Sequence, residues 1–358
     1  MYKFLILLLF AFTSCLNHKK EIEIGFYDWQ YNNSFENQKN NDSTLRILSP
    51  KNLYFKLLDV DWDENYQYYP TAIKDFNYFN NYSDTLLKNI NFIFCIYITN
   101  KVFEKIDSNK IEDFANKVYL KTLQITDTTR FYNSNNSRIL NRNISSFKEF
   151  QVDCDWTEKT RDKYFQFLNK IKIKFNKINV TSTLRLHQFK YRTKMGIPPV
   201  SEVYLMCYNV GKAKYFEDNN SIYSEKVAKE YFNIKEKYPL KVNIALPLFN
   251  WALIFKNNKF ESIINDFDAS FLKTNYCIKT PKTNIYIIAK DTTISNVFLV
   301  QGDILKFENV NNDDLMSAAT LCKKAMNNES SKLVFFDIKH GLEYNYETYE
   351  KVLNLFNN

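Results

Sequence analysis

Eight short runs of apolar residues, rich in β-branched and aromatic side chains, recur along this chain with helix-like segments between them. Each run has the length and continuous apolar character of a strand in a buried parallel sheet. Alternating strands and helices favour a single (β/α)8 TIM barrel, because each helix can cover the outside of the barrel. The runs are residues 23–29, 53–62, 91–100, 149–156, 179–188, 203–211, 242–249 and 332–338.

The segments between the runs carry helical spacing. In residues 158–175, Tyr164, Leu168 and Ile171 fall on one stripe, and Thr157 is placed to cap the helix. An open doubly wound sheet is the structural alternative, but no glycine-rich turn follows the first strand. Further helices are expected over 102–122, 222–234, 312–326 and 344–356, and polar loops over 30–50 and 124–147.

One β-rich stretch, residues 284–308, fits none of the eight strands. We expect it to form a β-hairpin inserted between strands seven and eight. The whole of residues 23–358 is then one barrel domain. The chain has 358 residues, of which 45% are hydrophobic, and these values suit a barrel of this size.

The N-terminus reads as an export signal. Lys3 precedes an apolar run from Phe4 to Phe12, which is far shorter than the roughly 20 residues of a membrane-spanning helix. The run ends in Phe12-Thr13-Ser14-Cys15, which resembles a bacterial lipobox. That resemblance implies removal of residues 1–14 as a signal peptide, lipidation of Cys15, and a tether over 15–22. A plain secretory signal is the competing interpretation.

A lipid anchor at Cys15 implies a membrane partner and a position in the cell envelope, at the outer membrane of a Gram-negative bacterium. The formal net charge is +8, without a strong Lys/Arg run or a nucleic-acid-binding motif. We therefore assign the basic excess to a solvated surface and expect no nucleic-acid partner.

The cysteines show no metal or disulfide pattern. Five remain after Cys15, and no CxxC pair occurs. Cys95, Cys154 and Cys207 each lie in an apolar run, which favours small buried hydrophobes over a disulfide framework or a metal site. The 3 histidines form no HxH or HExxH spacing. No metal or other cofactor is therefore expected, although Asp153, Asp155 and His187, with His340 as a further candidate ligand, leave a metal-dependent hydrolase as a minor alternative.

The stretch FQVDCDWTEKT, residues 150–160, sets two aspartates on alternate positions before a tryptophan. In a strand, Asp153 and Asp155 share one face. An exposed edge strand with a solvated polar face is one interpretation. A barrel strand that delivers carboxylates into a site is the other, and the barrel pattern favours it.

Polar and aromatic residues gather at the carboxyl ends of the predicted strands, where TIM barrels carry their chemistry. Aromatic faces beside carboxylates suit sugars, because apolar sugar faces stack on rings while hydroxyls bond to polar groups. Structural alternatives are that Arg185 is only an ion-pair partner of an aspartate, that His187 is structural, and that the tryptophans are packing residues. The predicted substrate-binding residues are Asp59, Asp61, Trp62, Trp156, Arg185, His187, Gln188, Tyr208, Asn209 and Trp251.

Three segments resemble glycoside hydrolase family 18, the chitinase-like barrels. The family's fourth strand carries D-G-x-D-x-D-x-E, and residues 150–157 here read FQVDCDWT. Its sixth strand carries M-x-Y-D, matched by MCYN at 206–209. Its seventh strand reads like G-L-P-x-Y-G plus an aromatic, matched by ALPLFNW at 245–251. The resemblance implies a barrel that acts on a glycan through carboxylates.

The fourth-strand segment departs from that pattern at the residue that matters most. The family's general acid is the final Glu of the motif, and Thr157 stands there, which cannot protonate a leaving oxygen. Glu158 comes one residue later and is a possible substitute acid if the helix start re-aims it. The predicted catalytic residues are Asp153, Asp155 and Glu158, with Asp59 and Asp61 as further acid/base possibilities.

Two functions stay open. The first is an exported glycoside-hydrolase-like enzyme, and the second is a non-catalytic glycan-binding lipoprotein with a degenerate chitinase-like site. The segments FQVDCDWT, TLRLHQ and GIPPV, together with the lipobox, are also similar to lipoproteins of Bacteroidetes-type bacteria, a resemblance that implies no particular activity.

Overall fold

The computed structural model describes residues 22–30, 35–74, 89–126, 147–216, 219–234, 236–327 and 331–357. The predicted signal peptide, the lipidation site Cys15 and residues 15–21 of the tether lie outside these residues. None of the helices in the described ranges is long and apolar enough to span a membrane.

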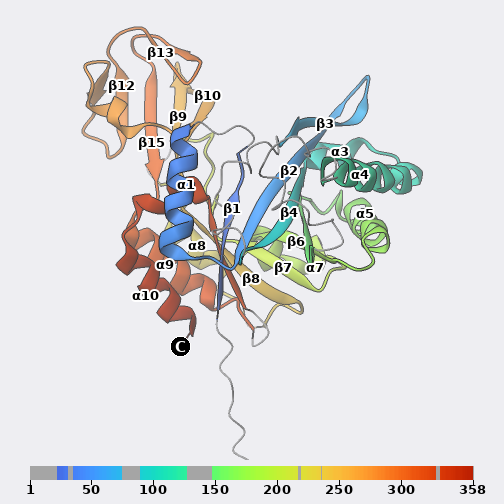
Figure 1. Cartoon of the computed structure of the whole chain (residues 1–358). Helices are drawn as coiled ribbons and strands as arrows, with labels where there is room; N and C mark the ends of the chain where they lie inside the picture. Colours follow the sequence, from blue (N-terminus) through green and yellow to red (C-terminus); the bar gives the residue numbers. More distant parts are fainter. Residues whose placement is uncertain are drawn as a thin grey trace, which may run out of the picture.

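Eight parallel strands close into a barrel, because β1 pairs with β2 on one side and with β16 on the other (Figure 1). The predicted TIM barrel is confirmed, and each predicted run overlaps one barrel strand. The barrel strands are β1 (Glu23–Asp28), β2 (Asn52–Asp63), β4 (Asn91–Ile98), β5 (Glu149–Asp153), β6 (Asn179–Arg185), β7 (Glu202–Met206), β8 (Lys241–Pro247) and β16 (Lys332–Phe336).

Helices surround the barrel, with α4 and α5 outside β4 and β5 and with α9 and α10 on the other side (Figure 1). The apolar stripe Tyr164, Leu168 and Ile171 of α5 is buried, as its spacing predicts. The helices are α1 (Phe35–Leu48), α3 (Asn100–Lys105), α4 (Ile111–Thr126), α5 (Arg161–Lys174), α6 (Leu186–Lys190), α7 (Arg192–Met195), α8 (Glu225–Tyr231), α9 (Asn312–Lys323) and α10 (Tyr346–Asn357).

One predicted helix and one predicted loop were wrong. The predicted helix over 102–122 is two helices, because Ile106 has an extended backbone (φ −63°, ψ 138°) and ends α3. Residues 30–50 were expected to be a loop, but α1 fills most of this range. The sequence of α1 is mostly polar and so predicted a loop, although Leu45 is buried in the main core. Of the predicted loop over 124–147, residues 127–146 lie outside the described residues.

The insertion between β8 and β16 is larger than the predicted hairpin over 284–308. Its five-stranded antiparallel sheet has the order β10-β9-β15-β12-β11 and lies beyond the carboxyl ends of the barrel strands (Figure 1). The strand β2 also continues into an antiparallel partner, β3 (Gln67–Ile73). The strands of the insertion are β9 (Asn250–Lys256), β10 (Lys259–Asn265), β11 (Cys277–Lys279), β12 (Ile285–Ile288) and β15 (Ile304–Asn309), beside the small pair β13 (Thr292–Ile294) and β14 (Val297–Leu299).

The strand β9 belongs to two hydrophobic cores. Leu253 and Phe255 pack into the main core of the barrel, whereas Ala252 and Ile254 pack into the smaller core of the insertion. This division follows from the strand geometry, since successive side chains point to opposite faces. The insertion is therefore fixed to the barrel through one shared strand.

A polar network lies inside the barrel at the amino-terminal end of its strands. The buried carboxylate of Glu149 accepts hydrogen bonds from Tyr204 Oη (2.7 Å) and Thr181 Oγ1 (2.9 Å). The ammonium group of Lys332 forms an ion pair with Glu149 and donates to Tyr204 Oη at 3.1 Å. Tyr54 Oη lies 2.9 Å from Tyr204 Oη. The network thus links β2, β5, β6, β7 and β16 across the barrel.

A disulfide joins Cys207, next to the end of β7, to Cys322 in α9. The prediction that Cys207 is an unpaired buried hydrophobe was therefore wrong. Spacing could not reveal the pair, because the two cysteines are 115 residues apart and meet only when α9 packs beside the barrel. Cys95 and Cys154 are free and buried, as expected.

Candidate functional site

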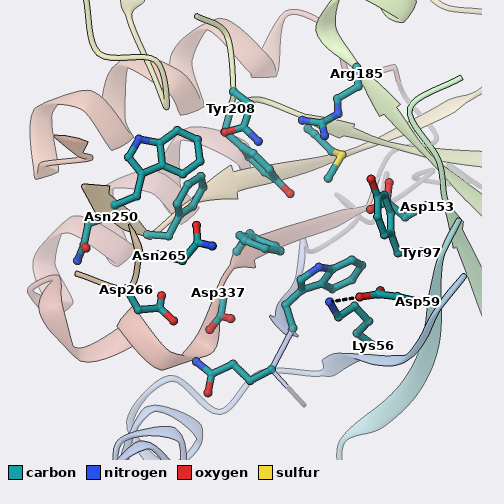
Figure 2. A pocket seen from close by; sticks show the side chains of 17 residues that line it. Lys56, Asp59, Tyr97, Asp153, Arg185, Tyr208, Asn250, Asn265, Asp266 and Asp337 are labelled. Carbon is teal, nitrogen blue, oxygen red and sulfur yellow. Dashed lines mark hydrogen bonds and ion pairs between the residues drawn. The ribbon is translucent and has the colours of Figure 1, made fainter. Parts of the chain in front are cut away.

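A cavity of about 420 Å³ opens at the carboxyl ends of the barrel strands. Each of the eight barrel strands, or the loop that directly follows it, contributes to the wall, and the insertion closes one side. This is the position at which TIM barrels carry their sites. The lining residues are Trp29, Gln30, Lys56, Asp59, Tyr97, Asp153, Arg185, Met206, Tyr208, Asn209, Phe249, Asn250, Trp251, Asn265, Asp266, Phe336 and Asp337 (Figure 2).

A connected group of aromatic rings forms one wall of the cavity. Phe336 lies at its centre, with ring centroids 5.7 Å from Trp29, 5.3 Å from Tyr208 and 5.5 Å from Phe249. Trp251 continues the group, 5.4 Å from Phe249. Trp29, Tyr208 and Phe249 follow strands β1, β7 and β8, and Phe336 ends β16. Trp251 lies in β9, so the barrel and the first strand of the insertion together hold the rings in place. The wall offers large apolar faces beside the polar groups of the cavity.

Asp153 ends β5 and reaches the cavity from the side opposite Asp337 (Figure 2). Its Oδ1 accepts a hydrogen bond from Thr183 Oγ1 at 2.6 Å. Burial, and next the charge of Asp155, raise the pKa of Asp153 to about 6. This carboxyl group can therefore hold or release a proton near neutral pH.

Asp155 and Arg185 form a bidentate ion pair. The guanidinium Nη2 lies 2.7 Å from Asp155 Oδ2, and Nε donates to Oδ1. Arg185 lines the cavity, but Asp155 does not. The chain leaves the strand after Asp153, so the expected alternation stops before it could turn Asp155 inward. The structure thus places Asp155 as the partner that fixes Arg185.

Asp337 follows β16 and is buried, with Oδ1 accepting from the backbone N–H of Lys339 at 2.7 Å. Burial raises its pKa to about 7, against the lowering charge of His340. Asp266, directly after β10, lines the cavity nearby (Figure 2). Burial alone would raise the pKa of Asp266, but the hydrogen bond from His340 and the charge of Lys339 hold it below its ordinary value.

Several buried polar atoms on the cavity wall lack a hydrogen-bond partner among the described residues. They include the hydroxyl of Tyr208, Oδ1 of Asn250 and Oδ1 of Asp59. The Tyr208 hydroxyl points toward the middle of the cavity (Figure 2). Buried polar atoms are normally hydrogen-bonded, so these atoms are placed to bond a ligand or the water that it displaces.

The structure brings six of the predicted site residues to the cavity. Arg185 comes from β6 as expected, and Trp251 belongs to the first strand of the insertion rather than to the end of strand seven. Tyr208 and Asn209 follow β7, and Asn209 has a positive φ of 55° that turns the chain there. The six are Asp59, Asp153, Arg185, Tyr208, Asn209 and Trp251.

Seven of the predicted site residues do not line the cavity. Most of them lie beyond the ends of strands that are shorter than the sequence predicted. Trp156 is buried between helices, where Nε1 donates to Met195 O at 2.9 Å and the ring stacks on Tyr164. Gln188 is buried and bonds the backbone of Trp156 and Arg185. The seven are Asp61, Trp62, Asp155, Trp156, Glu158, His187 and Gln188.

His187 and Glu158 are exposed. The strand β6 ends at Arg185, so His187 is part of helix α6 and does not share a strand face with Arg185. Asp61 accepts a hydrogen bond from Thr99 Oγ1 beside the β2–β3 extension, and Trp62 packs against the main core there. Glu158 lies in the turn before α5, and Thr157 beside it donates its N–H to Thr160 Oγ1 at 2.9 Å.

Several lining residues were not predicted, although the sequence or the strand register marks two of them. Lys56 interrupts the apolar run LYFKLLDV, and it forms a 3.2 Å ion pair with Asp59. Tyr97 is the residue of β4 that pairs in register with Asp153, so strand register would have placed both at the same height. Asp266 carried no such signal, because it reaches the cavity only through the fold of the insertion.

Comparison with known proteins supports the fold but gives no family assignment. No family model and no curated protein matches the chain. Solved structures do match. A chitinase from Chromobacterium violaceum ATCC 12472 has a TM-score of 0.54 at 9% identity, over 93% of this chain and 98% of that one. The C-terminal domain of a putative chitinase from Desulfitobacterium hafniense DCB-2 has a TM-score of 0.54 at 8% identity, over 94% and 99%.

A third match is the spore cortex-lytic enzyme SleL of Bacillus megaterium QM B1551. It has a TM-score of 0.51 at 11% identity, over 96% of this chain and 75% of that one. At these identities the likeness concerns the fold alone. The chain therefore has a TIM barrel whose fold is similar to that of these enzymes, as the resemblance to chitinase-like barrels predicted. The predicted similarity to lipoproteins of Bacteroidetes-type bacteria finds no support in these comparisons.

One prediction concerns the pH dependence of stability near the cavity. His340 Nε2 lies 2.8 Å from Asp266 Oδ1, and Nδ1 lies 2.6 Å from Glu343 Oε1. Burial opposes the charged imidazole, but these carboxylates and Asp337 raise the pKa of His340 to about 9. The charged His340 therefore stabilises the folded state fully below the pKa of an unfolded histidine, about 6.5, and this contribution to the free energy of unfolding is lost as pH rises through 9.

Raising the pH from 7 to 9.5 is therefore expected to lower the free energy of unfolding, by about 2 kcal/mol for this group. Urea unfolding at both pH values would measure the fall in the wild type and in His340→Gln, which keeps hydrogen bonds but cannot be charged. The fall should be smaller in the variant. Equal falls in both proteins would contradict the assignment.

Proposed function

We propose that this chain is an exported, lipid-anchored protein that binds a glycan in the cavity at the barrel mouth and does not hydrolyse it by the family 18 mechanism. The observation that carries the proposal is that the chain has a cavity at the barrel mouth but has no acidic residue at the position of the family 18 general acid. The cavity keeps an aromatic wall and unpartnered polar atoms. Thr157, at the family's acid position, is exposed and outside the lining.

The chemistry of the wall supports a sugar ligand. Trp29 and Phe336 offer ring faces, and Asp59, Asn250 and Tyr208 offer hydrogen-bonding atoms beside them. Sugars need both kinds of surface, since their rings are apolar on the faces and polar at the rim. Chitinases and a cortex-lytic enzyme among the structural neighbours are consistent with a glycan ligand.

The N-terminal sequence and the disulfide support export. The lipobox ending at Cys15 is the basis for the proposed anchor, with the outer membrane as the proposed location. Cys207 and Cys322 form a disulfide, and disulfides persist mainly in oxidising compartments outside the cytosol. Labelling of cells with a radioactive fatty acid would test the anchor, and an unlabelled wild-type protein would contradict it.

A second candidate function is hydrolysis through two cavity carboxyls other than the family pair. Asp153 and Asp337 both line the cavity, and burial raises both pKa values, to about 6 and about 7. One protonated and one ionised carboxyl is the arrangement that glycosidases use. Release of reducing ends from a ligand that binds, abolished by Asp153→Asn and by Asp337→Asn, would favour this function.

The test of the proposed function is a binding screen on the folded protein. Soluble oligosaccharides that bind should be identified first, and their affinity then measured by calorimetry. Trp29→Ala is expected to weaken binding at least tenfold, because Trp29 lines the cavity and contacts Phe336. Tyr346→Ala is the control, since Tyr346 is an exposed aromatic on α10. Binding to no glycan, or equal binding by Trp29→Ala, would overturn the proposal.

A further inference from the structure

We infer that the glycan bound in this cavity carries a free amino group, as in a de-N-acetylated amino sugar, rather than being neutral or fully N-acetylated. This inference rests on the proposed function and narrows its ligand class. It is drawn from the balance of charges on the wall and from the atoms left without hydrogen-bond partners.

The wall contains more carboxylates than cations. Four aspartates line the cavity, against Lys56 and Arg185. Each cation already has an acidic partner, since Lys56 forms an ion pair with Asp59 and Arg185 is held by Asp155 from outside the lining. The four aspartates are Asp59, Asp153, Asp266 and Asp337.

Two of these carboxyls form no ion pair among the described residues. Asp153 has a neutral hydrogen-bond donor in Thr183, and its charged neighbours are Asp155, Arg185 and Lys56. Burial is the largest influence on the pKa of Asp153 and raises it, Asp155 raises it further, and Arg185 and Lys56 lower it. A cation bound close to Asp153 would offset the cost of ionising this buried carboxyl.

Asp337 is in a similar position on the opposite wall (Figure 2). It has a backbone donor in Lys339, and its charged neighbours are His340, Asp266 and Asp28. His340 is itself bonded on both ring nitrogens, to Asp266 and Glu343, so it is not available to Asp337 as a direct partner. Because burial raises its pKa to about 7, this carboxyl is about half protonated at neutral pH, and a bound cation would favour its ionised form.

The unpartnered atoms also suit a donor-rich cation. Asn250 Oδ1 and Asp59 Oδ1 are acceptors, and the Tyr208 hydroxyl can accept as well. An ammonium group donates up to three hydrogen bonds and accepts none, whereas an acetamido group also brings an oxygen that needs a donor. The ring faces of Trp29 and Phe336 attract cations as well.

A metal ion fits this cavity less well than an amine. No group of three or more His, Cys, Asp or Glu in the described ranges is arranged to hold a metal ion. The cavity carboxyls are spread around the wall and do not converge on one point. Asp153 and Asp337, for example, lie on opposite sides (Figure 2). A ligand that spreads several groups across the cavity matches this arrangement.

The decisive measurement uses the wild-type protein and paired ligands. Calorimetry at pH 7 would compare glucosamine oligomers with N-acetylglucosamine oligomers of the same length. The glucosamine oligomers are expected to bind at least tenfold more tightly. At pH 6.5 their binding should also release protons, seen as a dependence of the binding enthalpy on the buffer, because a bound amine favours the ionised forms of Asp153 and Asp337.

Substitutions of the cavity aspartates would show which carboxyls cause the preference for amine-bearing oligomers. Asp337→Asn and Asp153→Asn should each reduce the preference for the amine form severalfold, while Asp313→Asn, at an exposed carboxylate of α9, should leave it unchanged. Equal or tighter binding of the N-acetylated oligomers to the wild type would overturn the inference and leave the proposed function standing. Binding of no oligosaccharide in the wider screen would instead overturn the proposed function.

Discussion

Replacing Lys332 by methionine is expected to lower the free energy of unfolding by about 3 kcal/mol, because removing one partner of a buried ion pair leaves the other charge uncompensated. Lys332 is 14% exposed and Glu149 5% exposed at the side chain. The carboxylate of Glu149 would keep its hydrogen bonds from Tyr204 and Thr181 but would lose its only adjacent cation among the described residues. Urea unfolding monitored by circular dichroism measures the change.

The double variant Glu149→Gln/Lys332→Met is the informative partner experiment. It removes both charges, so it should recover much of the loss, and a double-mutant cycle gives the coupling energy. Lys229→Met serves as a control, because Lys229 belongs to an exposed i,i+4 pair on α8 whose expected contribution is below about 1 kcal/mol. A Lys332→Met protein as stable as the wild type would show that the network contributes little.

Removal of the disulfide is expected to have an effect of similar size. The Cys207→Ser/Cys322→Ser variant should lose about 2–5 kcal/mol, mainly because the bond restricts the unfolded chain over a separation of 115 residues. Cys95→Ser/Cys154→Ser is not a suitable control, since both residues are buried in the core. Cys277→Ser, at a partly exposed free thiol, is suitable.

Reduction of the wild type gives an independent check of the same bond. Thermal unfolding with and without dithiothreitol should show a lower Tm for the reduced protein, and the reductant should leave the Tm of the double serine variant unchanged. An identical Tm for the reduced and oxidised wild type would contradict a stabilising disulfide. Mass spectrometry after alkylation would confirm which cysteines are paired.

The barrel could be predicted because its strands are specified locally. Runs such as LYFKLLDV and NFIFCIYI are continuous apolar segments of strand length, and buried parallel strands need that composition. The helix α1 could not be predicted in the same way. Its sequence FENQKNNDSTLRIL is polar and carries weak helical periodicity, and its place depends on tertiary contact, where Thr44 packs against Gly341.

The site was predictable at the level of strand ends but not of side-chain direction. Asp153 is still in β5 and enters the cavity, whereas Asp155 and Trp156 lie beyond the strand end and turn elsewhere. The predicted strand ran to residue 156, whereas β5 ends at Asp153, and the alternation of faces that would turn Asp155 inward does not continue past the end of the strand. The contribution of Asp266 depends on the fold of the insertion, which short-range patterns do not encode.

Because β9 packs into both the main core of the barrel and the core of the insertion, the insertion is held firmly beside the cavity. Lifting the insertion away from the barrel, as a hinged lid would, requires Leu253 and Phe255 to leave the main core. Exposing two such side chains opposes the movement by roughly 3–6 kcal/mol. Trp251, at the start of the same strand, is therefore a fixed part of the rim. Among the described residues, the insertion is therefore a fixed wall of the cavity and not a hinged lid, and the contacts that a bound molecule makes with this wall should set how long it stays.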